Sequence, residues 1–273
     1  HQKHARGNSI INKHMSDYYP VPDIFVDFVY VSQLLQAEGI RTGILAQRRA
    51  KPFCMGSLYW QLNDCWPAIS WSGIDYSGQW KALHYFAKQD FKNVIISPYL
   101  YNDSLEVFAV SDSLEDIQAE LTFKLIDFNG NNVDEWKIDQ SLQANSSQLI
   151  YKNDLNGILK NHSKTNYFLI VELQLNNKIV DTRTVYFARP KELALEQPNF
   201  SYEINKTAIG FEFIIKSKNL IKNMYLELPL EGFFTDNYFD VIPDIEKRVE
   251  FISNCTSEEI NKMIRFKSLN TIR

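Results

Sequence analysis

The sequence predicts the end of an α/β barrel, a partial (β/α)8 (TIM) barrel, followed by two antiparallel β-sandwiches of immunoglobulin size. Residues 1–92 combine two helical patterns, a short apolar run and a long aromatic loop. From residue 93, strand-like runs recur at short spacing between turn sequences. Prolines at 190 and 198 mark a linker that divides these runs into two groups. We therefore expect three units, at residues 1–92, 93–190 and 191–273.

The first element expected is one long helix over residues 24–49. Apolar side chains recur at helical spacing from Ile24 to Leu35, and Asp23 stands where an N-cap residue belongs. Two glycines inside this stretch each lower the stability of the helix by up to about 1 kcal/mol relative to alanine, but we still expect the helix to continue through them. Residues 1–22 have no clear periodicity, and we expect a loop there.

A strand, a loop and a second helix complete the predicted barrel segment. Residues 55–60 read as a short buried strand, with Gly56, Leu58 and Trp60 on one side. The polar, aromatic loop that follows is about 20 residues long, and loops of that length inside compact domains usually carry function. Residues 81–91 return to a helical pattern. Helix, strand, long loop and helix form the repeating unit of an α/β barrel, whose functional loops follow its strands.

The rest of the chain predicts two sandwiches. Turn sequences at residues 129–132 and 176–177 separate the strand-like runs of the first group. That group comprises residues 105–110, 119–126, 149–151, 167–175 and 182–187. The second group opens with residues 200–204, 208–216 and 224–228. Each group has the size of an immunoglobulin-like domain.

Composition limits the classes of partner. The chain has 273 residues, of which 45% are hydrophobic and 23% charged, a profile typical of a globular protein with more than one domain. A net charge of −4 without a long basic run argues against nucleic acid as a partner. No apolar run reaches the roughly 20 residues that span a bilayer, so no membrane partner is expected. The polar start does not resemble a signal peptide, and we interpret His1 as an internal residue of a longer protein.

Four of the five tryptophans lie between Trp60 and Trp80, interleaved with Asn63 and Asp64. An indole needs a large apolar surface and a partner for its N–H group, so such a cluster is unusual in an ordinary core. Flat apolar faces beside carboxylates and amides suit sugars, whose C–H faces stack on the rings while their hydroxyls form hydrogen bonds. The cluster therefore predicts a carbohydrate site.

Two segments strongly resemble β-mannosidases of glycoside hydrolase family two. The first is similar to the last strand, loop and helix of that family's catalytic barrel. It comprises Gly-Ser-Leu-Tyr-Trp-Gln-Leu-Asn-Asp at residues 56–64, Trp66, Trp71, Gly-Gln-Trp-Lys at 78–81 and Leu-His-Tyr-Phe at 83–86. The second, Gly-Phe-Phe-Thr-Asp-Asn-Tyr-Phe-Asp-Val-Ile-Pro at residues 232–243, is similar to the signature of the family's final immunoglobulin-like domain. Together the two segments stand in the family's order.

The resemblance implies a parent enzyme that is a retaining exo-β-mannosidase, requires no cofactor and removes terminal β-linked mannose. Retaining hydrolysis needs two carboxyl groups about 5–5.5 Å apart. In the family both are glutamates on earlier barrel strands, one within a Ser-Glu-aromatic-Gly motif that this sequence lacks. We therefore predict no catalytic residue in this chain and no hydrolysis by the chain alone. Its implied partners are a mannose-containing oligosaccharide and the upstream barrel of the parent enzyme.

The same resemblance implies substrate-binding roles for Trp60, Asn63, Asp64 and Trp66. Trp60 would form the floor of the mannose subsite, and its peptide bond to Gln61 is often cis in related barrels. Asn63 and Asp64 would either bind sugar hydroxyls or hold Trp60 in place. Trp66 would flank the leaving group.

Other readings stay open at this point. Trp71 and Trp80 are expected to pack the loop onto the barrel. One alternative function is a non-catalytic β-sandwich protein with a structural or carbohydrate-binding role, and another is a family-two glycosidase of different sugar specificity. His1, His4 and His14 have no defined metal-ligand spacing, so no metal site is expected. The Asn-, Lys- and Ile-rich composition favours a bacterial source. We expect a periplasmic or secreted bacterial protein, with a lysosomal enzyme as the alternative.

Overall fold

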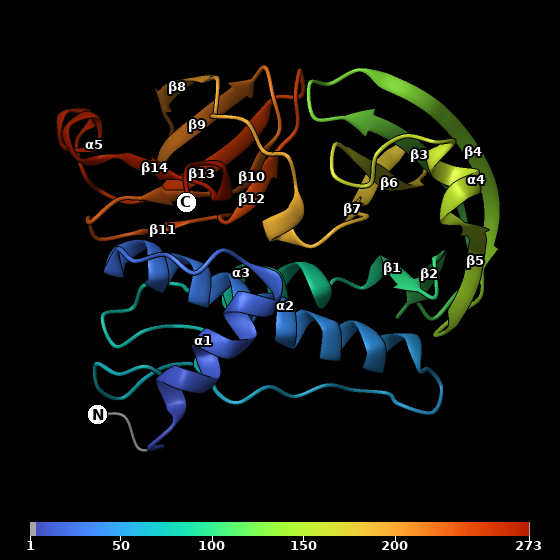
Figure 1. Cartoon of the computed structure of the whole chain (residues 1–273), viewed down its shortest axis with the longest axis horizontal. Helices are drawn as coiled ribbons and strands as arrows, with labels where there is room; N and C mark the ends of the chain where they lie inside the picture. Colours follow the sequence, from blue (N-terminus) through green and yellow to red (C-terminus); the bar gives the residue numbers. More distant parts are fainter. Residues whose placement is uncertain (1–3, 273) are drawn as a thin grey trace.

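The computed structural model describes residues 4–272, which form a helical segment packed along two β-sandwiches (Figure 1). His1, interpreted above as internal to a longer chain, lies outside the described residues, as does Arg273. Three helices lie along one side of both sandwiches: α1 (Gly7–Tyr18), α2 (Phe25–Arg49) and α3 (Ala82–Asp90).

The two helices predicted from periodicity are confirmed as α2 and α3. Asp23 does not cap α2, because Ile24 occupies the N-cap position and no side chain bonds the first turn. The loop expected over residues 1–22 is wrong, since α1 forms within it. Met15 is the single buried residue of α1, so little of this helix packs into the core.

Contacts with the linker between the sandwiches hold the end of α1. The guanidinium of Arg189 donates to the carbonyl of Asp17 at 3.0 Å, and the ammonium of Lys191 donates to the carbonyl of Ser16 at 2.6 Å. Basic groups at the carboxyl end of a helix satisfy its unpaired carbonyls and favour its dipole. Tertiary contacts therefore specify a helix that the local sequence does not predict.

The strand predicted over residues 55–60 is wrong. This segment runs without regular secondary structure, and no strand pairs with it in the described part of the chain. A strand is stable only when a neighbour accepts and donates its backbone hydrogen bonds. Leu58, expected to be buried, is 100% exposed. The described residues before Val94 thus contain helices and turns but no regular strand.

The first sandwich is antiparallel throughout and is immunoglobulin-like, as predicted. One sheet has the order β1-β2-β5 and the other β4-β3-β6-β7. Its strands are β1 (Val94–Tyr101), β2 (Ser104–Ser111), β3 (Ile117–Asp127), β4 (Asn132–Leu142), β5 (Ser147–Asp154), β6 (Tyr167–Leu175) and β7 (Lys178–Tyr186), with the short helix α4 (Leu155–Leu159) after β5. The sequence did not predict β1, which contains Pro98, or β4, an edge strand exposed along most of its length.

The second sandwich follows a 3-10 turn, η1 (Pro190–Glu192). Its sheets have the orders β11-β13-β9-β8 and β12-β10-β14. The strands are β8 (Phe200–Lys206), β9 (Gly210–Ser217), β10 (Ile221–Glu227), β11 (Phe233–Phe234), β12 (Phe239–Val241), β13 (Lys247–Ile252) and β14 (Arg265–Lys267), accompanied by α5 (Ser257–Met263) and η2 (Leu269–Thr271). The three runs predicted to open this unit are confirmed as β8, β9 and β10.

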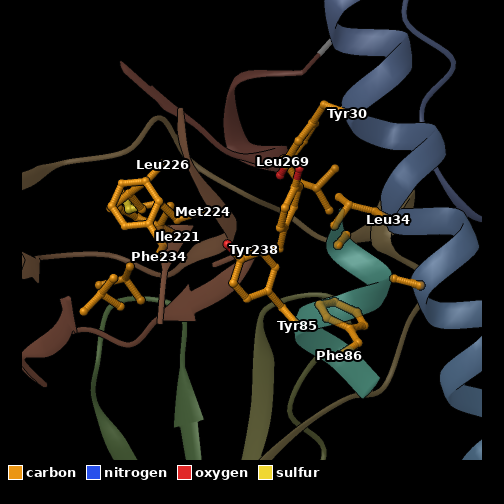
Figure 2. Packing of buried hydrophobic residues seen from close by; sticks show 14 of the residues in the cluster. Tyr30, Leu34, Tyr85, Phe86, Ile221, Met224, Leu226, Phe234, Tyr238 and Leu269 are labelled. Carbon is orange, nitrogen blue, oxygen red and sulfur yellow. The ribbon is translucent and has the colours of Figure 1, made fainter. Parts of the chain in front are cut away.

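One hydrophobic core joins the helices to the second sandwich. Tyr30 and Leu34 of α2 and Tyr85 of α3 belong to the same buried cluster as Tyr238 and Met224 of the sandwich (Figure 2). The Tyr85 and Tyr238 rings lie 6.1 Å apart between centroids, and the Tyr30 hydroxyl donates to the carbonyl of Asn223 at 2.5 Å. The helices therefore share their main core with the second sandwich.

Buried ion pairs join the helices to the first sandwich. The carboxylate of Asp90 at the end of α3 accepts from Arg183 of β7 at 2.6 Å and from Arg41 of α2 at 3.2 Å. Arg48 of α2 donates to the carboxylate of Asp112 at 2.7 Å. Because unpaired buried charges are costly, these pairs fix the helices against the sheet as well as in register with each other.

Asp240 of β12 ties the two sandwiches together. Its carboxylate accepts from the hydroxyls of Tyr186 at 2.6 Å and Thr184 at 3.0 Å, both on β7 of the first sandwich. Within its own sandwich it accepts from the Lys222 ammonium at 3.1 Å and the Asn223 amide at 2.9 Å. Burial would raise the pKa of Asp240, but the Lys222 charge and these hydrogen bonds outweigh burial and hold the pKa below its ordinary value.

Replacing Asp240 with asparagine should destabilise the chain strongly. Asp240→Asn leaves the buried Lys222 ammonium without its counter-charge, and removing one partner of a buried pair costs about 3–5 kcal/mol of the free energy of unfolding. Urea unfolding at pH 7, followed by circular dichroism, measures the change. Glu246→Gln, which breaks exposed pairs with Lys216 and Arg248, serves as the control and should leave the midpoint almost unchanged. Equal midpoints for both variants would contradict the role given to Asp240.

Candidate functional site

The tryptophan loop, residues 61–81, closes on itself through backbone bonds. Asn63 bridges Ile74 in parallel, and Ile74 bridges Trp80 in antiparallel fashion. The Asp64 amide donates to the Ile74 carbonyl at 3.0 Å, and the Lys81 amide donates to the Gly73 carbonyl at 2.9 Å. These bonds replace a regular sheet, so the loop has a defined framework although residues 55–60 form no strand.

The side chain of Asp64 lies at the centre of this framework and is only 7% exposed as a residue. Its carboxylate accepts from the Ser70 hydroxyl at 2.5 Å, from the Ser72 hydroxyl at 2.7 Å and from the Lys81 ammonium at 2.9 Å. Lys81 also donates to the Ser72 hydroxyl at 2.7 Å. We call Asp64, Ser70, Ser72 and Lys81 the Asp64 knot. The knot joins Asp64, near the start of the tryptophan loop, to Ser70 and Ser72 in its middle and to Lys81 at its end.

Electrostatics favour the charged form of the Asp64 knot. Burial would raise the pKa of Asp64, but the hydrogen bonds from Ser70, Ser72 and Lys81 and the Lys81 charge hold that pKa below its ordinary value. All of these partners are donors, and they use both carboxylate oxygens. The carboxylate therefore holds Ser70, Ser72 and Lys81 in place, while the two predicted roles of Asp64, binding sugar hydroxyls or holding Trp60, stay predictions.

Trp60 lies at the open side of the loop. Its side chain is 70% exposed, and its peptide bond to Gln61 is cis, as the resemblance implied. Together with Leu58, Tyr59 and Trp71 it lines a pocket of about 530 Å³ against α2, where Gly39 and Gly43 leave room. The pocket thus has two exposed indoles among its lining residues.

Asn63 and Trp66 are exposed on the same loop but do not line the pocket that holds Trp60. The Asn63 amide donates to the Asp64 carbonyl at 3.2 Å. Trp66 projects from the excursion between Asp64 and Ser70. Of the four residues predicted to bind substrate, three are therefore exposed, while Asp64 lies beneath them. Their roles toward a sugar remain predictions.

Trp80 packs the loop against the second sandwich. Its ring stacks on Phe233 of β11, with centroids 4.8 Å apart and planes at 23°, and also meets His84 and Tyr85 of α3. The sequence predicted a packing role for Trp80, but its partner was expected in the barrel. Trp71 in contrast is 64% exposed.

Ser70, Ser72, Lys81 and Phe233 are the site residues that the sequence interpretation missed. Serines separated by one position beside a tryptophan give no distinctive signal, and Phe233 lies in another domain. No group of three or more metal-ligating side chains gathers anywhere within residues 4–272. Over the same residues, no helix is long and apolar enough to cross a membrane.

Comparison with known proteins places these features in a family context. Residues 103–192 match the Mannosidase Ig/CBM-like domain, and residues 195–272 match a mannosidase Ig-fold domain. Beta-mannosidase A of Aspergillus clavatus is 28% identical over 279 residues, which cover 92% of this chain and 30% of that protein. Its counterpart in Aspergillus terreus is 29% identical over 263 residues, covering 86% of this chain and 28% of that protein. The chain resembles β-mannosidases along nearly its whole length.

Solved structures agree with this resemblance. The β-D-mannosidase of Dictyoglomus thermophilum superposes with a TM-score of 0.86 and 26% identity, covering 97% of this chain and 32% of that chain. The exo-chitosanase CsxA of Amycolatopsis orientalis shares the fold, with a TM-score of 0.72, 16% identity and coverage of 96% and 36%. The β-mannosidase-like chain thus spans about 30% of the length of the curated relatives it matches.

The Asp64 knot predicts an acid-shifted titration. Because the folded pKa of Asp64 is lowered, the knot contributes stability above the unfolded value of about 3.9 and loses it as the pH falls through the folded pKa. A ¹³C-carboxyl NMR titration should give Asp64 a midpoint below that unfolded value. Lys81→Met removes the ammonium and should raise the midpoint. A midpoint that is the same in both proteins would contradict the ion pair.

Proposed function

We propose that this chain is part of a retaining exo-β-mannosidase that hydrolyses terminal β-linked mannose from oligosaccharides. In this proposal residues 1–92 supply the last portion of a (β/α)8 barrel of glycoside hydrolase family two, and the sandwiches brace it. The exposed indole of Trp60 beside Trp71, in a chain that resembles β-mannosidases over most of its length, is the observation that carries the proposal.

The exposed apolar side of the helical segment supports an incomplete barrel. Phe53 is 96% exposed, and further large apolar side chains of residues 55–71 are exposed with it: Met55, Leu58, Trp60, Leu62, Trp66, Ile69 and Trp71. So many exposed large apolar side chains in one segment are unusual, and large exposed apolar patches usually mark interaction sites. The partner that we propose is the remainder of the barrel from the same polypeptide, whose strands would pair with residues 55–60 and cover Leu58.

In the proposed reaction this chain supplies side chains that bind the sugar, and the rest of the enzyme supplies the catalytic carboxyl groups. Trp60 would stack on the apolar face of the mannose ring, and Asn63 and Trp66 would contact its hydroxyls and the leaving group. The nucleophile and the acid/base would be two glutamates on other barrel strands, held about 5–5.5 Å apart as retention requires. No metal or organic cofactor enters this reaction.

The rival function is a non-catalytic β-sandwich protein in which the helical segment is only a brace. A brace gains nothing from indoles exposed to solvent, whereas a sugar subsite requires them, and this difference favours the enzyme. A family-two glycosidase with another sugar specificity would use the same exposed surface. Substrate profiling with β-mannosides, β-glucosides and β-galactosides separates that possibility.

The purified 273-residue chain should not hydrolyse p-nitrophenyl β-mannoside, because both carboxyl groups are proposed to lie elsewhere. The same polypeptide with its preceding barrel region should hydrolyse it and should prefer it over the other glycosides. Detectable turnover by the chain alone would contradict the assignment of the catalytic groups. Absence of turnover by the longer protein on any of these glycosides would contradict the proposed function.

Trp60→Ala in the active longer protein should lower kcat/KM for the β-mannoside. We expect a loss of about 10- to 100-fold, equivalent to the ~1.5–3 kcal/mol that burying a large apolar side chain contributes. Trp136→Phe, in the core of the first sandwich, is the matched control and should leave kcat/KM nearly unchanged. Equal effects of the two substitutions on kcat/KM would contradict the role of Trp60 in the subsite.

A further inference from the structure

We propose that the second sandwich positions the tryptophan loop through Phe233, so that Phe233 is a positioning residue for the saccharide site. The purpose of this arrangement rests on the proposed function, but the coupling itself is a property of this chain. The coupling joins the tryptophan loop to β11. These two segments lie far apart in the sequence and belong to different domains.

The contact between the two surfaces is a ring stack. Phe233 of β11 lies 4.8 Å from Trp80 between ring centroids, with the planes at 23°. Tyr85 and His84 meet the same indole at 5.5 Å and 4.6 Å. Trp80 is therefore held by α3 and by the sandwich together. An aromatic pair of this kind contributes beyond its buried area and restricts the orientation of both rings.

The strand that carries Phe233 has little freedom to move. Gly232 just before it has φ +144°, and a Cβ at that position would lie 2.5 Å from the carbonyl oxygen of Ile252 on β13, so glycine is required for the close approach. Just after the strand, the Thr235 amide donates to the Glu250 carbonyl at 2.8 Å. The Lys88 ammonium of α3 also donates to the Thr235 carbonyl at 2.8 Å. Phe233 is thus presented by a fixed support.

Trp80 passes this constraint to the tryptophan loop. Its backbone bridges Ile74, which in turn bridges Asn63. The next residue, Lys81, donates to the carboxylate of Asp64 and to the hydroxyl of Ser72. A shift of Trp80 would therefore displace the Asp64 knot, and with it Trp66 and Trp71, which lie between Asp64 and Ser72 in the sequence. Recognition residues on loops need this kind of support from surrounding residues to keep their geometry.

The test is the set of indole N–H signals of ¹⁵N-tryptophan-labelled chain, which needs no sugar. Phe233→Leu keeps an apolar side chain at β11 but removes the ring stack. We expect the signals of Trp66 and Trp71 to shift or broaden in addition to that of Trp80, while Trp136 in the first sandwich stays in place. Phe233→Tyr retains a ring and should restore the signals of Trp66 and Trp71.

Tyr202→Leu is the matched control, because Tyr202 is 42% exposed on the same sandwich, against 37% for Phe233, and its ring contacts are Phe200 and Phe266. It should leave all five indole signals unchanged. Movement of the Trp80 signal alone in Phe233→Leu would overturn the proposal, as would equal changes in the control. Failure of the proposed hydrolase activity would leave this result untouched, so the two proposals are tested separately.

Discussion

The packing of α2 and α3 on the second sandwich is the constraint on which the rest of the structure depends. Tyr30, Leu34 and Tyr85 contribute to a core that the sandwich alone could not complete, and Tyr238 fills the space between them. Without this interface the apolar stripes of the helices would be exposed to water, which costs roughly 25 cal/mol per Å². Because this interface is complete, the tryptophan loop between the helices has fixed ends.

The helical segment has one side that packs on the sandwiches and another side that exposes apolar residues. Toward the sandwiches Asp90 is paired with Arg183, and within the tryptophan loop Asp64 is paired with Ser72. Away from them, Leu58 and Trp60 face solvent. The carboxylates of Asp64 and Asp240 follow one rule, since hydrogen-bond donors and an ammonium group outweigh burial and hold the pKa of each below its ordinary value. This contrast between paired and exposed surfaces places the candidate site on the exposed side of the helical segment.

Local pattern predicted most of the regular elements but not the contacts between domains. The periodicity of α2, the alternation in β3 and the apolar run in β6 are properties of contiguous residues, so the sequence was sufficient for them. The strand at residues 55–60 failed because a strand depends on a neighbour, and α1 was missed because only Met15 is buried in it. The exposure of Trp60 was not predicted, because residues 55–60 were expected to form a buried strand. The Phe233 stack depends on folding that brings distant residues together.

The central claim is that the exposed side of residues 53–71 belongs to a catalytic barrel supplied by the preceding polypeptide. The most direct measurement is the nucleotide sequence of the gene upstream of the codon for His1. The account predicts barrel strands that carry two glutamates, one of them in a Ser-Glu-aromatic-Gly context. A start codon or an unrelated domain at that place would contradict it and leave a free-standing β-sandwich protein in which Trp60 has no sugar to bind.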